Sequence, residues 1–239
     1  MSLRIALLNA AHDGEDNRRN FRRELDADLV EYDVTERELP DSFAFDACIV
    51  TGSRASAYWD EEWITDLETW VRDAVDRGLP ALGVCFGHQL LAQALDGRVE
   101  PMDEYEIGYR TIEHDGENPL LDGVSESFTA FTTHSDHVAE LPPGAERFAE
   151  NDYGVHGFRK GDVFAVQFHP EYDPETAESV TRGKDLPDER IRGVLDGITE
   201  ENYRAACDTK RLFENFTDYV RARRSATADG QRSPAAADD

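Results

Sequence analysis

One cysteine stands where an apolar run gives way to a helical pattern. The stretch ALGVCFGHQLLAQAL places Cys85 between Gly83 and Gly87. A thiol on such a strand-to-helix turn projects above the carboxyl edge of a sheet, and the two glycines relieve the crowding of the turn. The first N–H groups of the following helix favour a thiolate and can bind an oxyanion. The pattern predicts that Cys85 is a nucleophile.

A thiol nucleophile needs a base, and His169 has the most suitable context of the seven histidines. It ends the run DVFAVQFH and is followed by Pro170, which cannot donate to a sheet ladder and marks the carboxyl end of a strand. Glu171 lies two residues after the histidine, and in an extended chain it can turn back to the second imidazole nitrogen. The sequence therefore predicts a catalytic triad of Cys85, His169 and Glu171.

Short apolar runs bounded by turn residues predict the strands that position these side chains, at residues 4–8, 47–51 and 81–84. Apolar residues at helical spacing predict a covering helix over residues 60–77. Residues 98–166 alternate β-favouring pieces with turn residues and are expected to complete the sheet with strands and hairpins. The predicted fold class is α/β, with an open, mostly parallel sheet, flanking helices, a β-rich middle segment and C-terminal helices.

The C-terminal region returns to helical patterns. Pro174 is expected to start one short helix, and Pro187 lies near the first turn of another. Thr199 can cap a longer helix through about Arg223, and that helix is expected to bury Tyr203 together with three apolar side chains, Phe213, Phe216 and Val220.

The remaining cysteines and the last residues give structural rather than chemical expectations. Cys48 and Cys207 are expected to be buried core thiols. Residues 1–224 are expected to form one domain. Residues 225–239 lack large apolar side chains and are expected to be a disordered acidic tail.

The charge balance excludes some classes of partner. The chain has 51 acidic and 25 basic residues, a formal net charge of −26, and only three of the basic residues are lysines. Such a surface repels nucleic acid and anionic lipid, and it suggests adaptation to high salt, with an acidic protein of ordinary salt as the alternative. No apolar run has the length of a membrane span or secretory signal, and unpaired cysteines fit a reduced cytoplasm, so a cytoplasmic protein is expected.

The two motifs together resemble a known family. GxCxGxQ at residues 83–89 and HPE at residues 169–171 closely resemble the Cys-His-Glu motifs of class I glutamine amidotransferases, in their order and spacing. The resemblance covers about residues 4–216 and is strongest to the amidotransferase domain of GMP synthase and to stand-alone proteins similar to it, including γ-glutamyl peptidases. It implies a flavodoxin-like sheet and no cofactor.

The resemblance also implies roles for individual residues. Cys85 would be the nucleophile, His169 the base and then the acid, and Glu171 the group that orients the imidazole. The backbone N–H groups of Ser53 and Phe86 would form the oxyanion hole. The GMP synthase pattern has two glycines and a proline where this chain has Ser53 and Arg54, so whether the hole is preformed stays open. Substrate-binding roles would fall to Gly52, Gln89, His134, Ser135 and Asp136.

A metal site is the competing interpretation of part of this pattern. His134 and His137 lie three residues apart with Asp136 between them. On a strand, however, these side chains spread over both faces, so no metal is expected.

The predicted reaction is hydrolysis of the γ-amide of glutamine to glutamate and ammonia through a thioester on Cys85. No ATP-binding loop of the SGGxDS or GxxxxGK[ST] type occurs, so any synthetase partner is expected to be a separate subunit. Two alternatives to this reaction remain. In the first, the chain is a γ-glutamyl peptidase that acts on a γ-glutamyl conjugate. In the second, it is a non-catalytic binding module.

Overall fold

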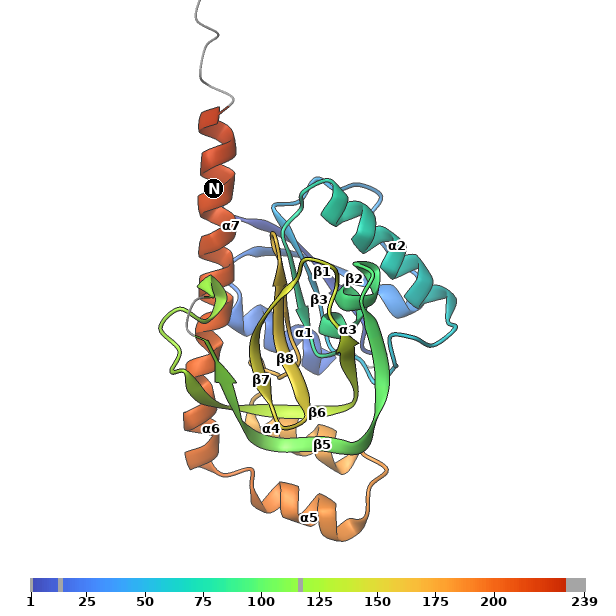
Figure 1. Cartoon of the computed structure of the whole chain (residues 1–239), viewed down its shortest axis with the longest axis vertical. Coiled ribbons are helices and arrows are strands. Elements are labelled where there is room, and N and C mark those ends of the chain that lie inside the picture. Colours follow the sequence, from blue (N-terminus) through green and yellow to red (C-terminus); the bar gives the residue numbers. More distant parts are fainter. Residues whose placement is uncertain (1, 13–14, 116–117, 231–239) are drawn as a thin grey trace, which may run out of the picture.

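The strands form one sheet with a parallel and an antiparallel part. The computed structural model describes residues 2–12, 15–115 and 118–230 (Figure 1). Within these ranges nine strands pair in the order β2-β1-β3-β4-β9-β8-β7-β5-β6. Their bounds are β1 Arg4–Asn9, β2 Asp28–Asp33, β3 Ala47–Val50, β4 Ala81–Val84, β5 Arg98–His114, β6 Ser127–Glu140, β7 Glu146–Asn151, β8 Gly154–Lys160 and β9 Val163–Val166. From β2 to β9 neighbouring strands are parallel, and from β9 to β6 they are antiparallel.

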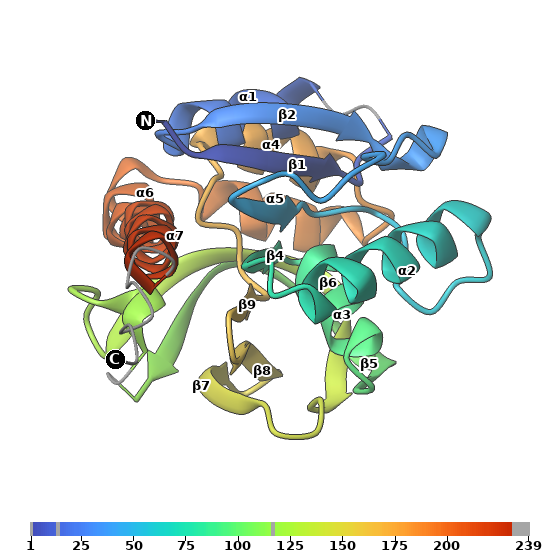
Figure 2. The same cartoon turned by 90° about the horizontal axis from the view of Figure 1, so that it is seen from above.

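Helices cover both faces of the parallel part of the sheet (Figure 2). The helices are α1 Glu15–Glu24, α2 Glu62–Asp76, α3 Phe86–Ala94, α4 Pro174–Arg182, α5 Asp188–Asp196, α6 Glu200–Ala206 and α7 Arg211–Gly230. Apolar side chains of α2 and α3 pack on one face against Ala6 and Val50, and those of α1 and α7 pack on the other against Ile5 and Ile49. Because successive residues of a strand face opposite sides of the sheet, the apolar strands β1 and β3 contribute side chains to the cores on both faces.

A third apolar cluster joins the C-terminal helices to the antiparallel strands. Ala177 of α4 packs against Ile107 of β5 and Phe131 of β6, and Val194 of α5 joins the same cluster. The side chain of Asp173 accepts a hydrogen bond from the backbone N–H of Thr176, which caps the start of α4. This cluster holds α4 and α5 over the strand ends where the predicted triad lies.

The predicted α/β architecture is confirmed, with differences in detail. The strands at residues 4–8, 47–51 and 81–84 correspond to β1, β3 and β4, and the helix at 60–77 corresponds to α2. Residues 98–166 do form strands, and β5 to β9 are joined to one another by antiparallel pairing while β9 is parallel to β4, so the sheet is mixed rather than mostly parallel. The strand of the run DVFAVQFH ends at Val166, and His169 pairs separately with Phe131 in an isolated bridge.

The C-terminal region requires corrections. The single long helix expected from Thr199 is divided: Thr199 caps α6, a 3₁₀ turn at Cys207–Lys210 follows, and α7 begins afterwards. Cys207 is half-buried because it starts this turn, and Tyr203 is also half-buried, whereas Cys48 is fully buried as expected.

Helix α7 continues through Gly230, so residues 225–230 of the expected disordered tail are helical. Residues 231–239 of that tail lie outside the described residues. Across the described ranges, no helix combines the length and apolar character needed to cross a membrane.

Candidate active site

Cys85 occupies a strained turn between β4 and α3. Its backbone has φ 54° and ψ −103°, in a region that residues other than glycine rarely adopt. A Cβ added at Gly83 would lie 2.3 Å from the carbonyl oxygen of Gly87, and one added at Gly87 would lie 2.2 Å from that of Val50. The two flanking glycines therefore allow a turn too tight for any side chain, and this turn places the sulfur at the carboxyl edge of the sheet.

His169 is oriented from both sides. Its Nδ1 lies 2.7 Å from Oε1 of Glu171, as the sequence predicts, although the chain turns at these residues instead of remaining extended. Its backbone N–H donates to the carbonyl of Phe131 at 2.8 Å. The ring of Tyr172 stacks on the imidazole with 4.0 Å between ring centroids and 22° between their planes. These contacts fix the imidazole and leave Nε2 buried with no partner among the described residues.

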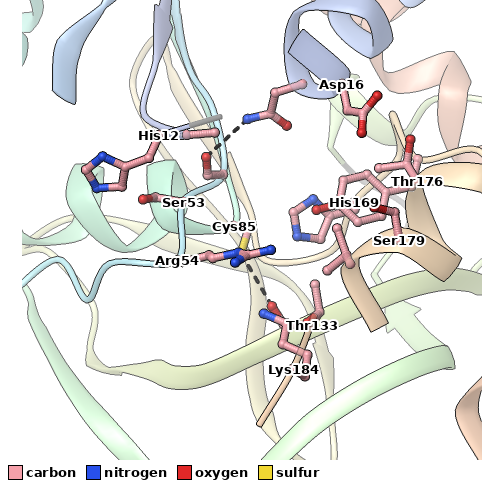
Figure 3. A pocket seen from close by; sticks show the side chains of 15 residues that line it. His12, Asp16, Ser53, Arg54, Cys85, Thr133, His169, Thr176, Ser179 and Lys184 are labelled. Atoms are coloured by element: carbon pink, nitrogen blue, oxygen red, sulfur yellow. Dashed lines mark hydrogen bonds between the residues drawn. The ribbon is translucent and has the colours of Figure 1, made fainter. Parts of the chain in front are cut away.

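The imidazole and the thiol meet beside Gly52. A Cβ at Gly52 would lie 3.0 Å from Cε1 of His169 and 3.7 Å from Cβ of Cys85, and Figure 3 shows the imidazole beside the sulfur. Burial by itself lowers the pKa of His169, but the charges of Glu171 and Cys85 outweigh it and raise that pKa to about 10. The imidazole is then charged at neutral pH and carries a proton that it can donate.

The thiol lies between two cavities of unequal size. The larger has a volume of about 300 Å³ and is lined by His169, Tyr172 and Asn17 among others. The smaller has a volume of about 30 Å³ and is lined by Gln89 and by the strand segment 133–136. Cys85 lines both cavities, as do Ser53, Arg54, Thr133 and Lys184, so the two cavities adjoin at the sulfur.

The residues predicted for the oxyanion hole are both at the thiol. Ser53 and Phe86 line the smaller cavity together with Cys85. Phe86 begins α3, so its backbone N–H has no carbonyl partner within the helix. Neither the N–H of Ser53 nor that of Phe86 has a backbone acceptor in the described part of the chain. Gly52 directly precedes Ser53, and a Cβ added there would lie against both His169 and Cys85.

The predicted substrate-binding residues divide by role. Gln89 Nε2 donates to the carbonyl of Asp136 at 2.9 Å and to Oε1 of Gln167 at 3.0 Å, so its amide hydrogens are already used. The Asp136 carboxylate accepts hydrogen bonds from two hydroxyl groups, those of Ser56 and Tyr58. Ser135 is exposed between two buried neighbours. The Gln89 amide hydrogens and the Asp136 carboxylate are therefore already used within the protein, whereas the exposed Ser135 is accessible to a substrate.

His134 lines the smaller cavity, but both of its ring nitrogens belong to a second buried cluster. Its Nε2 lies 2.5 Å from Oε2 of Glu106, and Nε2 of His156 lies 3.1 Å from the same oxygen. Burial by itself raises the pKa of Glu106, but hydrogen bonds from the two histidines lower it well below its usual range. The His134 Nδ1 lies 2.9 Å from the carbonyl oxygen of Asp136, so this cluster supports the segment that lines the smaller cavity.

This cluster is also the group of side chains that best matches a metal site. Ligand atoms of Glu106, His134 and His156 lie within 4.8 Å of one another. The carboxylate is already at hydrogen-bonding distance from both imidazoles, which is closer than ligands on opposite sides of an ion would be. The metal site considered from the sequence combined His134, Asp136 and His137, and neither Asp136 nor His137 belongs to this group. The absence of a resident metal stays a prediction.

Several functional residues were not predicted. Tyr172 follows the HPE motif directly, but its stacking on His169 depends on the turn after β9. The side-chain amide of Asn17 in α1 donates to the carbonyl of Gly52 at 3.2 Å and holds the loop beside the thiol. Glu106 lies in β5, and its contact with His156 of β8 requires the antiparallel pairing of both strands with β7.

The α/β fold places a thiol on a strand-to-helix turn beside a histidine and a glutamate, which is the arrangement that the sequence motifs predicted. The sequence profile described as glutamine amidotransferase class-I matches residues 17–182, which is more than half of the chain. The chain belongs to the class I glutamine amidotransferase family.

Relatives and solved structures agree with this assignment. The chain is 38% identical over 151 residues to GMP synthase [glutamine-hydrolyzing] of Burkholderia ambifaria and 34% identical over 130 residues to that of Clostridium novyi. These matches cover 58% and 53% of this chain but 27% and 24% of the relatives, so the chain spans about a quarter of their length.

Two solved structures share the fold. A glutamine amidotransferase from Thermotoga maritima superposes with a TM-score of 0.78 at 20% identity, covering 91% of this chain and 99% of its own. A glutamine amidotransferase from Methylobacillus flagellatus superposes with a TM-score of 0.71 at 20% identity, covering 92% and 94%.

Proposed function

We propose that this protein hydrolyses the γ-amide of glutamine to glutamate and ammonia, with Cys85 as nucleophile. The observation that carries the proposal is the buried Nε2 of His169, which is unpartnered within the described residues, beside a thiol on a strained turn, with Glu171 fixing the opposite ring nitrogen. This is the geometry of a nucleophile, a base and an orienting group.

The steps follow from the positions of these groups. The thiolate of Cys85 attacks the amide carbon, and the oxyanion that forms is stabilised by the N–H groups of Ser53 and Phe86. His169 gives its proton to the departing nitrogen as the carbon–nitrogen bond breaks, which leaves a γ-glutamyl thioester. A water molecule, deprotonated by the same imidazole, cleaves the thioester, releases glutamate and restores the thiol.

The ammonia is proposed to pass to a synthetase partner. The support is that curated relatives are GMP synthases and that this chain matches only about a quarter of their length. Purification from the native cell extract at high salt, followed by mass spectrometry, tests this step. Stoichiometric recovery of an ATP-using synthetase supports it, and recovery of the chain alone at every salt concentration contradicts it.

The hydrolytic step is tested by replacing the thiol. We expect Cys85→Ala to lower glutamate release from glutamine by at least about 10³-fold, because no covalent intermediate can form. Cys207→Ala is the matched control, since it removes a half-buried thiol outside both cavities. Equal glutamate release from the wild type and Cys85→Ala contradicts the proposal.

A further inference from the structure

The larger of the two cavities is the one that can hold a whole substrate. Its volume of about 300 Å³ is roughly ten times the share of liquid volume that one water molecule takes, which is enough for an amino acid. The smaller cavity, of about 30 Å³, has room for a single small group. A substrate with its amide at Cys85 therefore extends its carbon chain into the larger cavity, and the charges that line this cavity decide which end groups it accepts.

Two positive side chains line the larger cavity without a carboxylate partner in the described part of the chain. Arg54 and Lys184 border both cavities, as Cys85 does, so they lie where the two cavities adjoin. The nearby Arg182 is paired with Glu178, but among the described residues no carboxylate forms an ion pair with Arg54 or Lys184. In a chain with 51 acidic residues, this is a local positive charge that the carboxylate of a ligand can neutralise.

Packing rather than ion pairing holds these two cations. A Cβ at Gly183 would lie 3.0 Å from Nη2 of Arg54, so the guanidinium rests against the residue that follows α4. The Lys184 Nζ lies 5.2 Å from the centre of the Tyr105 ring. A glycine and an aromatic ring carry no charge, so both cations keep their N–H donors for a ligand.

The carboxylates around the thiol already have partners. Among the described residues that line the two cavities, the carboxylates are those of Asp16 and Asp136. Asp16 lines the larger cavity and lies 3.2 Å from the guanidinium of Arg19. Asp136 lines only the smaller cavity, and its two oxygens accept hydrogen bonds from the hydroxyl groups of Ser56 and Tyr58. An ammonium group in the larger cavity therefore meets no unpaired carboxylate among these residues.

The two ends of the larger cavity differ in charge. Figure 3 shows Asp16 across the cavity from Lys184. In glutamine the α-ammonium and the α-carboxylate are bonded to the same carbon, so the two groups lie together. A carboxylate held by Arg54 and Lys184 keeps the ammonium at the positive end of the cavity, away from Asp16. Charge thus favours binding of the carboxylate and gives no advantage to the ammonium.

We propose that Arg54 and Lys184 recognise the carboxylate at the far end of the substrate, and that the α-ammonium is not needed. The site then also hydrolyses monoamides of five-carbon dicarboxylic acids that have no α-amino group, of which glutaramate is the simplest. The inference rests on the proposed attack of Cys85 on the amide of glutamine and adds a second class of substrate. The same two cations disfavour an amide whose far end carries only an ammonium group.

The reaction follows the steps proposed for glutamine. The thiolate of Cys85 forms a bond to the amide carbon, and the carbon–nitrogen bond breaks as His169 protonates the nitrogen, which leaves as ammonia. One water molecule then adds to the thioester carbon, the carbon–sulfur bond breaks, and the dicarboxylate is released. The monoamide and water are consumed, and no oxidant, reductant or nucleotide is needed.

The test compares three amides that differ in the charged groups at the far end. Glutamine carries a carboxylate and an ammonium, glutaramate carries only the carboxylate, and γ-aminobutyramide carries only the ammonium. Ammonia release is measured for each amide with the wild type, Arg54→Gln, Lys184→Gln and the double variant. We expect the wild-type kcat/KM for glutaramate to be at least about a third of that for glutamine, and to exceed that for γ-aminobutyramide by roughly 10-fold or more.

The variants test whether the two cations cause this preference. In the double variant the ratio of kcat/KM for glutaramate to that for γ-aminobutyramide should fall to near one, and each single variant should lower it in part. Arg192→Gln is the matched control, because it changes an exposed arginine of α5 that lines neither cavity, and the ratio should stay at its wild-type value. Because the ratio compares two substrates of one protein, a loss of folded protein does not change it.

Three results would overturn the inference. The first is a wild-type kcat/KM for glutaramate below about a third of that for glutamine, which would show that the ammonium is required. The second is a wild-type preference for glutaramate over γ-aminobutyramide of less than about 10-fold. The third is a double variant that keeps the wild-type ratio, as an equal loss of activity on all three amides would give, because the carboxylate would then be bound elsewhere.

Failure of the proposed glutaminase activity has a different signature. If none of the three amides releases ammonia in the wild type beyond the level of Cys85→Ala, the proposed hydrolysis itself is wrong. If glutamine is cleaved in a Cys85-dependent manner and glutaramate is not, the hydrolysis of glutamine stands and only the inference is overturned. Cys85-dependent cleavage of glutaramate but not of glutamine would support the inference and contradict the glutaminase proposal.

Discussion

The described part of the chain contains two buried clusters of glutamate and histidine, and they differ in what surrounds the imidazole. Glu171 contacts His169 at 2.7 Å, and Glu106 contacts His134 at 2.5 Å; both carboxylates are completely buried. Each cluster has one buried ring nitrogen without a partner among the described residues, but Nε2 of His169 lies beside a thiol and a cavity, whereas His156, with its free Nδ1, lines neither of the two cavities. The contact between glutamate and histidine is thus common to both clusters, and the available nitrogen beside Cys85 is what makes one of them suited to catalysis.

In the second cluster the same kinds of side chain hold strand β6 in place. The His134 nitrogens face two acceptors, the Glu106 carboxylate and the carbonyl of Asp136, so neither is available to a substrate. Neither Glu106 nor His156 lines either of the two cavities. This cluster fixes β6 at the point where its main chain borders the smaller cavity.

Replacing the imidazole of His169 gives the largest expected difference between the clusters. We expect His169→Gln to lower kcat for glutamine hydrolysis by about 10³-fold, because both the base and the acid of the reaction are removed. His156→Gln is the matched replacement in the second cluster and should change kcat much less. Steady-state kinetics on the two variants, each checked by circular dichroism, test the assignment, and similar losses in both would contradict it.

Removing the second carboxylate should act on stability. In Glu106→Ala two buried imidazoles lose their shared acceptor, and we expect a loss of about 3–5 kcal/mol in the free energy of unfolding. The lowered pKa of Glu106 means that its contribution is present above its ordinary value of about 4.5 and is lost as the pH falls below it.

Urea unfolding at neutral and acidic pH checks this expectation. The difference in unfolding free energy between wild type and Glu106→Ala should shrink as the pH falls. If the free energy of unfolding of Glu106→Ala equals that of the wild type at neutral pH, the cluster does not stabilise the fold.

Replacing Glu171 should move a pH limit as well as a rate. We expect Glu171→Gln to lower kcat by roughly 10²-fold, because the imidazole loses its orienting acceptor and its charge partner. The pKa of His169 is raised to about 10, so the activity that requires its charged form is lost as the pH rises through that value. Without Glu171 the alkaline limit of the pH–rate profile should shift to lower pH.

The contribution of His169 to folding stability is also lost as the pH rises. A histidine with a raised pKa stabilises the folded state fully below its ordinary value of about 6.5 and loses that contribution as the pH rises through about 10. An unchanged alkaline limit in Glu171→Gln would show that Glu171 does not set the charge state of His169.

Salt should affect the charged surface more strongly than the buried clusters. The formal net charge is −26, and screening of surface repulsion is expected to raise the free energy of unfolding by at least about 1 kcal/mol between low and molar salt. The alkaline limit set by the buried His169 should move little over the same range, since buried pairs are screened much less. Unfolding and pH–rate curves at two salt concentrations provide the measurement.

The sequence predicted those parts whose signal is local. The strand, turn and helix around Cys85 are encoded within 15 consecutive residues, and the HPE motif supplies His169 and Glu171 together. Helix α1 and strand β2 were not predicted because α1 is almost entirely polar, with Asn20 and Phe21 as its buried residues.

Contacts that depend on tertiary packing could not be predicted in the same way. Glu106 and His156 are 50 residues apart and meet only because β5 and β8 belong to one antiparallel group. The break between α6 and α7 at Cys207 was likewise missed, since helical spacing continues on both sides of it. The packing of Arg54 against Gly183 at the thiol depends on how α4 sits over the sheet edge.

The central claim is that Cys85 carries the acyl group of the substrate. Acid quenching of the protein during turnover of isotopically labelled glutamine, followed by proteolysis and mass spectrometry, tests it most directly. We predict a labelled γ-glutamyl thioester on the peptide that contains Cys85, and none in Cys85→Ala. Glutamate production without label at Cys85, or with the label on Cys48 or Cys207, would contradict the account.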